Sequence, residues 1–281
     1  MNDGMRNYHT HSWRCMHARG TEEEYVQRAV EQGYAVLGFS DHTPWPYESG
    51  FVSGMRMRLD QFEDYRRTVL ALREKYAGVI EIPLGLECEA FPKYTEWLRD
   101  FKAQYLDYVL LGNHYDTCDE GDHGLLYPAG GFYFGRCTRP EQVIRYGQRT
   151  LAGMQTGLYD CLAHPDLFMH TYPRFDAECR AVSVDLCQAA RALDLPLEFN
   201  LLGLSRSGAD YERGWQGYPC PDFWQIAAET GCTAIIGCDA HDPEFLRKRH
   251  YVDEAREALD LLGMKVIDRL PLHGEKRGDA P

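Results

Sequence analysis

Short runs of apolar residues alternate along this chain with longer segments in which apolar residues recur every three or four positions. The short runs are almost continuously apolar, which is typical of parallel strands that are covered on both faces. This pattern predicts strands at residues 7–11, 35–42, 80–88, 108–114, 159–164, 196–202, 233–238 and 265–267.

The longer segments carry the end signals of helices. Thr21 and Glu24 form a capping box, in which the threonine hydroxyl accepts a hydrogen bond from the amide three residues on and the glutamate bonds back. Gly33 is a stop signal for the same helix. By such signals, the sequence predicts helices at residues 21–33, 60–78, 138–157, 177–193, 222–230 and 253–262.

Strand and helix alternate about seven times, which predicts an α/β fold of the parallel barrel type. The 281 residues are 44% hydrophobic, enough for a barrel in one domain. We expect a single domain over residues 1–273, followed by a polar tail at 274–281. Two long connections, 43–58 and 115–137, follow predicted strands, so we expect both to cover the carboxyl ends of the strands.

The composition narrows the classes of partner. A formal net charge of −13 argues against binding to a nucleic-acid backbone, and no apolar stretch reaches the roughly 20 residues of a membrane span. The ten cysteines are scattered and form no CxxC pair, so we expect reduced thiols in a cytoplasmic protein. A small phosphorylated substrate stays possible, because bound divalent cations reverse the local field. The sequence is silent on the oligomeric state.

Histidine and carboxylate residues recur where the predicted strands end. Because the carboxyl ends of barrel strands meet at one mouth, these side chains can converge there. The mixture of imidazole and carboxylate suits Zn, Fe or Mn better than Ca or Mg, and the number of candidates is large enough for three ions. The candidate ligands are His9, His11, His17, His42, Glu87, His114, His164, Asp239 and His241.

The individual signals differ in strength. In His9-x-His11 and Asp239-x-His241, alternation along a strand places both side chains on one face. Taken alone, a lone histidine is more often structural than a ligand, and it is the recurrence at six strand ends that favours a metal site. Asp41 precedes His42 and is either the carboxylate that orients an imidazole or a proton shuttle. No GxSxG, Walker A or Rossmann motif offers a competing chemistry.

The ordered set of HxH, Asp-His, single Glu, two separate histidines and a closing DxH resembles the signature of the PHP (polymerase and histidinol phosphatase) superfamily. The segments at 19–25, 38–42, 163–167 and 198–200 are similar to its monofunctional histidinol-phosphatase branch. The resemblance extends from His9 to about Leu262, which is nearly the whole chain.

This resemblance implies a distorted (β/α)7 TIM-like barrel with three divalent cations at the carboxyl ends of the strands. One cation would take His9, His11, Glu87 and Asp239, and a second would take His114, His164 and the shared Glu87. The third would take His17, His42 and His241. The implied activity is hydrolysis of L-histidinol phosphate in histidine biosynthesis. The alternatives are a phosphatase for another small ester (phosphotyrosine, a nucleotide or a sugar phosphate) and a metal-stabilised accessory protein without turnover.

The branch usually follows its Glu-x-Asn strand with a Gly-Leu-Arg turn whose arginine contacts the substrate phosphate. This chain has Gly203-Leu204-Ser205-Arg206, one residue longer, so Arg206 is either the phosphate contact or a surface arginine. The segment 113–137 is longer than the resemblance leads us to expect, and it lies where the substrate would be selected. His170 is a candidate substrate contact, and Asp41, metal-bound water or His170 is a candidate proton donor to the leaving group.

Overall fold

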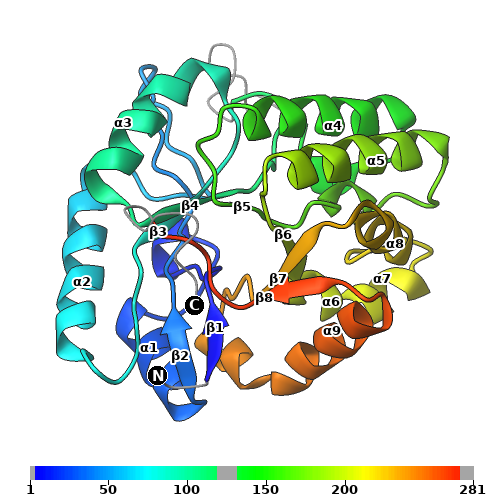
Figure 1. Ribbon diagram of the computed structural model, residues 1–281. Coiled ribbons are helices and arrows are strands. Elements are labelled where there is room, and N and C mark those ends of the chain that lie inside the picture. The colour runs from blue at the N-terminus through cyan, green and yellow to red at the C-terminus, as the bar shows by residue number, and fades with distance from the viewer. Residues whose placement is uncertain (1–3, 119–131, 273–281) are drawn as a thin grey trace.

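The computed structural model describes residues 4–118 and 132–272. In this part of the chain, seven parallel strands follow one another around a ring, and the long helices lie outside it (Figure 1). The strands are β1 (Met5–Asn7), β2 (Tyr34–Leu37), β3 (Gly85–Cys88), β4 (Tyr108–Leu111), β5 (Cys161–Leu162), β6 (Leu197–Asn200) and β7 (Thr233–Gly237).

Backbone pairings close the ring. β1 pairs with β2, and β3 to β7 pair in chain order. Bridges at Val36–Glu81 and Phe39–Leu84 join β2 to β3, and a bridge at Thr10–Ala240 joins the end of β1 to the end of β7. An eighth strand, β8 (Lys265–Ile267), pairs with the start of β7. The arrangement confirms the (β/α)7 barrel that the resemblance implies.

The helices cover the outside of the ring. The buried apolar faces of α1 and α2 contribute Tyr25, Val26, Tyr65 and Val69 to a large cluster between helices and strands. Among the described residues, none of the helices combines the length and the apolar character that crossing a membrane requires. The bounds are α1 (Glu22–Glu31), α2 (Phe62–Lys75), α3 (Thr95–Tyr105), α4 (Pro140–Met154), α5 (Ala177–Ala192), α6 (Leu201–Leu204), α7 (Ser207–Glu212), α8 (Pro221–Thr230) and α9 (Arg249–Leu261).

A smaller apolar cluster fills the inside of the barrel. It holds Tyr8, Val36, Leu110 and Leu270 among its members. The Tyr108 hydroxyl lies 2.6 Å from the carbonyl oxygen of Tyr8, to which it donates a hydrogen bond across the ring. The chain that follows β8 crosses the middle of the ring and buries Leu270 completely (Figure 1). This segment closes the amino end of the barrel and leaves the carboxyl ends of the strands for a site.

The predicted strands are present but most are shorter than their apolar runs. The expected strand 159–164 is regular only at Cys161–Leu162, and the expected strand 196–202 ends at Asn200. The Asn200 side chain accepts a hydrogen bond from the Gly203 amide (2.9 Å), which starts helix α6 where the sequence predicted continued strand. Local capping therefore overrides the apolar pattern there.

The predicted helices are confirmed, with α1 beginning at the capping box of Thr21 and Glu24 as expected. Three helices were not predicted: α3, α6 and α7. Helix α3 buries Leu98 and Phe101, but Tyr94 at its start makes no side-chain cap, so the sequence lacks the usual start signal. The tail at 274–281 and the middle of the connection 115–137 lie outside the described residues.

Candidate metal centre

The structure brings all nine predicted ligand residues to the carboxyl ends of the strands. Each of them lies in or directly after one of β1 to β5 or β7, except His17, which follows the short helix η1 (Trp13–Cys15). Several groups of three side chains offer ligand atoms that all lie within 4.8 Å of one another. His9, His11 and His241 each belong to more than one of these groups. The groups therefore adjoin and form one continuous centre.

The first group surrounds one point with four atoms. His9 Nε2 and His11 Nε2 are 3.1 Å apart. His11 Nε2 lies 3.4 Å from Glu87 Oε2 and 3.3 Å from Asp239 Oδ1, and His9 Nε2 lies 3.5 Å from each of these oxygens. Four ligands at about 2.1 Å from a tetrahedral metal are about 3.4 Å from one another. The spacing fits one cation.

The second group lies on the other oxygen of the same glutamate. Glu87 Oε1 is 2.8 Å from His164 Nε2 and 3.4 Å from His114 Nε2. The two rings are 5.1 Å apart between centroids. Oε2 faces the first group and Oε1 faces the second, so Glu87 belongs to both groups through separate oxygens.

The third group contains two nitrogen atoms that face each other. His17 Nε2 and His241 Nε2 are 3.1 Å apart. His17 Nδ1 lies 2.7 Å from the Cys15 carbonyl oxygen, and His241 Nδ1 lies 3.0 Å from the Asp239 carbonyl oxygen, so each Nδ1 carries the proton and each Nε2 a lone pair. Two lone pairs at this distance repel each other unless a cation or a proton lies between them.

His42 occupies a position between the groups. Its ring centroid is 5.3 Å from that of His17 and 4.4 Å from that of His11. Its Nδ1 lies 3.1 Å from Glu87 Oε2. The structure therefore places His42 near the bridging carboxylate as well as near the third group, to which the resemblance assigns it.

Unsatisfied buried atoms show that the donor set suits cations. Glu87 Oε2 is buried and accepts no hydrogen bond, although three imidazole nitrogens lie within 3.5 Å of it. Buried polar atoms in proteins are almost always paired, and unpaired ones have a functional explanation. A cation at the centre of these atoms satisfies the carboxylate and the imidazoles together, so the residues fit a metal.

The charges of the cluster favour replacement of protons by cations. Burial alone lowers the pKa of His11, but the neighbouring carboxylates of Asp239, Asp41 and Glu87 raise it to about 9. Burial and the charge of His11 lower the pKa of His241 to about 3. Without cations, protons on histidines such as His11 balance the negative charge of the carboxylates. Cations that bind there displace these protons.

Cys15 also lies within reach, and the sequence did not single it out. Its thiol belongs to groups with His17 and His241 and with His11 and Asp41. Burial, and then the charge of Asp41, raise the pKa of the Cys15 thiol. A neutral thiol is a poor metal ligand, so the ordinary contribution of Cys15 is to packing.

Backbone strain accompanies two of the ligands. His164 has a φ of 29° and Asp239 a φ of 49°, in the left-handed region that favours glycine. Met16, next to His17, has a φ of 66°. Strained residues of this kind cluster at functional sites because the surrounding structure holds them there. In both ligands the strain turns the backbone directly after a strand end.

Two polar residues of β6 orient ligands, and the sequence analysis had not given them this role. Glu198 Oε1 lies 2.7 Å from His9 Nδ1, which leaves His9 Nε2 free for a metal. The Asn200 side-chain nitrogen donates to Asp239 Oδ2 (3.2 Å) and to Glu198 Oε2 (3.0 Å). The signal available in the sequence was a pair of polar residues, two apart, inside an otherwise apolar strand.

Asp41 is completely buried behind His11. Its Oδ1 lies 3.8 Å from His11 Nδ1, and its Oδ2 accepts a hydrogen bond from the Ser12 hydroxyl (2.6 Å). Of the two roles that the sequence left open, this position favours orientation of an imidazole over contact with a substrate.

The candidate substrate contacts lie beside the ligands. The His170 ring is 5.6 Å from that of Tyr218, which in turn is 6.3 Å from the ring of His164. His170 Nε2 lies 3.5 Å from a buried oxygen of Asp210. Burial lowers the pKa of His170 and the charge of Asp210 opposes this shift, while the Arg206 side chain is exposed.

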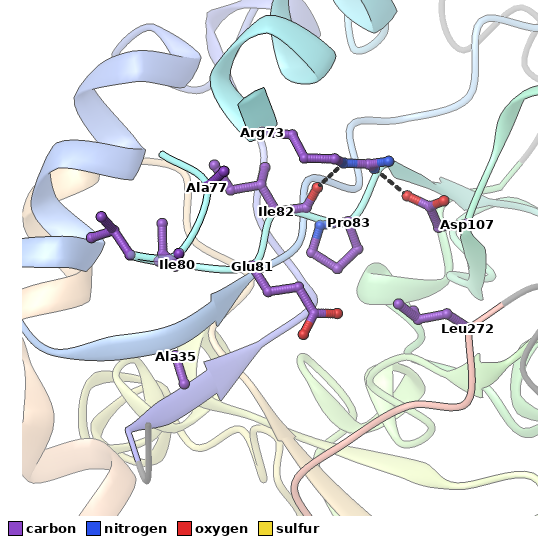
Figure 2. A pocket seen from close by; sticks show the side chains of 11 residues that line it. Ala35, Arg73, Ala77, Ile80, Glu81, Ile82, Pro83, Asp107 and Leu272 are labelled. Carbon is purple, nitrogen blue, oxygen red and sulfur yellow. Dashed lines mark hydrogen bonds and ion pairs between the residues drawn. The ribbon is translucent and has the colours of Figure 1, made fainter. Parts of the chain in front are cut away.

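A cavity lies at the opposite end of the barrel, away from these residues. It measures about 500 Å³ and lies beside the starts of β3 and β4. Figure 2 shows Arg73 reaching from the Ile82 carbonyl oxygen to the Asp107 carboxylate at its edge. Glu81, which also lines it, pairs with Arg269. Its charged groups are already paired, so it is not part of the metal centre.

Comparisons with known proteins place the chain in a family. The PHP domain family matches residues 7–201. A probable histidinol-phosphatase of Deinococcus radiodurans is 30% identical over 95% of this chain and 97% of its own length. A histidinol-phosphatase of Bacillus subtilis is 24% identical over 84% of this chain and 93% of its own length.

Solved structures agree on the fold. A histidinol phosphate phosphatase of Lactococcus lactis, in complex with zinc, L-histidinol and phosphate, has a TM-score of 0.70 at 19% identity and covers 94% of this chain and 95% of its own. A putative histidinol phosphatase of Listeria monocytogenes has a TM-score of 0.70 at 20% identity and covers 88% and 99%. With a family match over more than half of its length and a 30% identical relative along almost all of it, the chain belongs to the PHP domain family.

Proposed function

We propose that this protein is a metal-dependent phosphomonoesterase that hydrolyses L-histidinol phosphate to L-histidinol and phosphate, a step of histidine biosynthesis. The observation that carries the proposal is the convergence of all nine family ligand residues, with the two oxygens of Glu87 facing separate groups. The names of the relatives in Deinococcus radiodurans and Bacillus subtilis support the choice of substrate.

The centre holds three divalent cations in this proposal, of the kind Zn, Fe or Mn. His9, His11, Glu87 and Asp239 bind the first, and Glu87, His114 and His164 bind the second. The third is bound by His17, His42 and His241. The zinc in the Lactococcus lactis structure supports the choice of metal. The mixed imidazole and carboxylate set supports it independently.

Cations bound there neutralise the phosphate dianion and lower the pKa of water, which makes the ester open to attack at neutral pH. The side chains of the protein orient the metal ligands, bind the substrate and neutralise its charge. Glu198 and Asp41 hold the rings of His9 and His11 in place. Arg206 donates charge-assisted hydrogen bonds to phosphoryl oxygens. His170, which is partly exposed, contacts the remainder of the substrate and is better placed than the buried Asp41 to give the leaving oxygen a proton.

The substrate is tested by kcat/KM for phosphate release from histidinol phosphate, beside phosphotyrosine, a nucleotide and a sugar phosphate, with metal-loaded enzyme. We expect a value of at least about 10⁴ M⁻¹s⁻¹ for histidinol phosphate, in the ordinary range of enzymes, and far lower values for the others. Weak and even activity across the four esters would move the natural substrate to another phosphoester. No turnover of any ester by fully loaded protein would favour the accessory role.

The metal centre is tested by His11→Ala and Glu87→Ala. Each substitution removes one of the four atoms of the first group. We therefore expect loss of most of the activity and of bound metal, while the chain stays folded. Arg206→Ala is expected to raise KM or lower kcat without reducing the metal content, because Arg206 is not a ligand. Either ligand variant with full metal content and normal turnover would contradict the assignment.

A further inference from the structure

A buried glutamate outside the nine ligands stands directly behind the second group. Glu89 follows Glu87 by two residues and is 1% exposed. Its Oε1 lies 3.2 Å from His114 Nδ1 and accepts a hydrogen bond from Arg56 Nη2 (2.9 Å). Its Oε2 accepts from Arg56 Nη1 (3.1 Å) and from Trp45 Nε1 (3.0 Å). Each oxygen of Glu89 thus has two hydrogen-bond partners, which hold the carboxylate in one orientation.

The contact with Glu89 fixes the ring of His114. A carboxylate opposite Nδ1 keeps the proton on that nitrogen and turns the lone pair of Nε2 away from it. His114 Nε2 then faces Glu87 Oε1 at 3.4 Å, in the second group. The ring also stacks on Tyr133 at 6.3 Å between centroids, which restricts its rotation from one side.

The partners of Glu89 come from a different part of the chain. Trp45 and Arg56 both belong to the connection 43–58 that leaves β2, and both are buried. Arg56 Nη1 also bonds the Thr43 carbonyl oxygen (3.2 Å), and the Trp45 ring packs on Phe91 at 5.4 Å and on Tyr94 at 5.4 Å. A buried ion pair of this kind contributes little to stability by itself, and the contact of its glutamate with His114 points to a positioning role.

We propose that Glu89 positions His114 for the second cation, and that Arg56 and Trp45 of the connection 43–58 hold Glu89 in the orientation that this requires. Because Arg56 neutralises Glu89, the glutamate contributes orientation more than charge. Glu198 has the corresponding place behind His9 but comes from β6. Glu198 also accepts a hydrogen bond from the His164 amide (3.1 Å), whereas the Nδ1 contact of His114 comes from Glu89 alone among the described carboxylates. The inference rests on the proposed metal centre and is independent of the substrate.

The test is a zinc titration of metal-stripped protein against a chromophoric chelator, which counts the equivalents bound and gives the affinity of each. We expect Glu89→Gln to weaken one equivalent by about 10- to 100-fold, as is typical when the group behind a metal-bound histidine is changed. His114→Ala marks which equivalent this is. If Glu89 acts through His114, the double variant Glu89→Gln/His114→Ala weakens no equivalent beyond those affected in His114→Ala alone.

Two controls separate positioning from a general loss of structure. Glu81→Gln removes a second bidentate Arg–Glu pair, the one with Arg269 at the opposite end of the barrel, and should leave every zinc affinity unchanged. Glu198→Gln should weaken the equivalent bound by His9, which His114→Ala leaves bound.

Normal affinity for all equivalents in folded Glu89→Gln protein, or a double variant that loses a further equivalent, would overturn the role of Glu89. If Glu89→Gln fails to fold, Arg56→Lys decides: it keeps the buried charge but loses the planar fork, so we expect the same equivalent to weaken several-fold. Unchanged zinc binding by folded Arg56→Lys would then contradict the proposal. A wild-type protein that binds no zinc would instead contradict the metal centre.

Discussion

At the scale of single residues, the centre depends on small side chains as much as on its ligands. A Cβ atom at Gly112 would lie 2.0 Å from Glu87 Oε1, and one at Gly237 would lie 1.8 Å from Glu198 Oε1. Real Cβ atoms do not approach oxygen so closely, so any larger residue displaces the carboxylate. Because each glycine has no Cβ atom, it leaves room for one buried carboxylate.

We therefore expect Gly237→Ala to move Glu198, loosen the ring of His9 and weaken the zinc equivalent that His9 binds. Overpacking of this kind also costs about 1–3 kcal/mol of unfolding free energy. Zinc titration and urea unfolding measure the two effects. Gly208→Ala is the matched control, because its Cβ meets nothing within 4 Å, and it should leave the zinc affinities unchanged. Unaltered binding and stability in Gly237→Ala would show that Glu198 adapts freely.

At the scale of elements, local signals fix where helices begin and where strands end. Helix α1 begins at Thr21, whose hydroxyl oxygen accepts from the Glu24 amide (3.4 Å), while Glu24 Oε2 accepts from the Thr21 amide (2.7 Å). Strand β6 ends where Asn200 caps α6, and the strained φ values of His164 and Asp239 follow β5 and β7. Ends of this kind set how far each strand runs toward the centre.

Loss of the cap should lower stability without touching the site. Thr21→Ala removes the hydroxyl that satisfies a free amide of α1, which costs about 1 kcal/mol of unfolding free energy. Zinc affinity and kcat are expected to stay at their wild-type values. Thr21→Ser, which restores the hydroxyl, serves as the control in urea unfolding. A change in zinc affinity in Thr21→Ala would mean that α1 is coupled to the centre.

At the scale of the whole molecule, the barrel is closed by contacts between distant parts of the chain. Thr10 bridges to Ala240, and Arg6 pairs with Asp268 at 2.6 Å. Leu270, three residues after β8, lies completely buried in the cluster that fills the ring. The two ends of the described chain therefore meet at the amino end of the barrel, opposite the metal centre.

Truncation of the Leu270 side chain should lower the free energy of unfolding. Leu270→Ala leaves a cavity inside the ring, for which we expect a loss of about 2–5 kcal/mol in unfolding free energy. Leu261→Ala is the matched control: that leucine is 82% exposed and should change stability by less than about 0.5 kcal/mol. Chemical unfolding of metal-loaded protein measures both. Equal stabilities of the two variants would show that the segment after β8 does not support the barrel.

The charge of the centre predicts the pH dependence of the whole protein. In metal-free protein the pKa of His11 is about 9, above its usual 6.5, so its protonation stabilises the fold below pH 6.5 and this contribution is lost as the pH rises through 9. Zinc must displace that proton. We expect zinc affinity to rise with pH up to about 9, by about tenfold per unit for each proton released. Chelator-buffered titrations at pH 6.5, 7.5 and 8.5 measure the slope, and a flat profile would contradict it.

The sequence alone determined the order of the elements and which residue types are available to the candidate metal centre. Continuous apolar runs and patterns with a period of 3.6 depend on neighbouring residues, so the eight strands and six of the helices could be predicted. Eight of the nine candidate ligands were found at the ends of these strands, and His17 follows helix η1. Helix α3 was missed because Tyr94 provides no cap, and strands 159–164 and 196–202 were predicted too long because caps and strained turns end them.

Only the tertiary structure decided how the ligands are held. Glu198, Glu89 and Arg56 act on His9 and His114 from other strands and connections, and no local pattern shows which histidine each of them reaches. The division of Glu87 between two groups likewise depends on distances across the barrel. Residue types and spacing are written along the chain, whereas orientation, burial and the sharing of a carboxylate arise only when the ring closes and distant strands lie side by side.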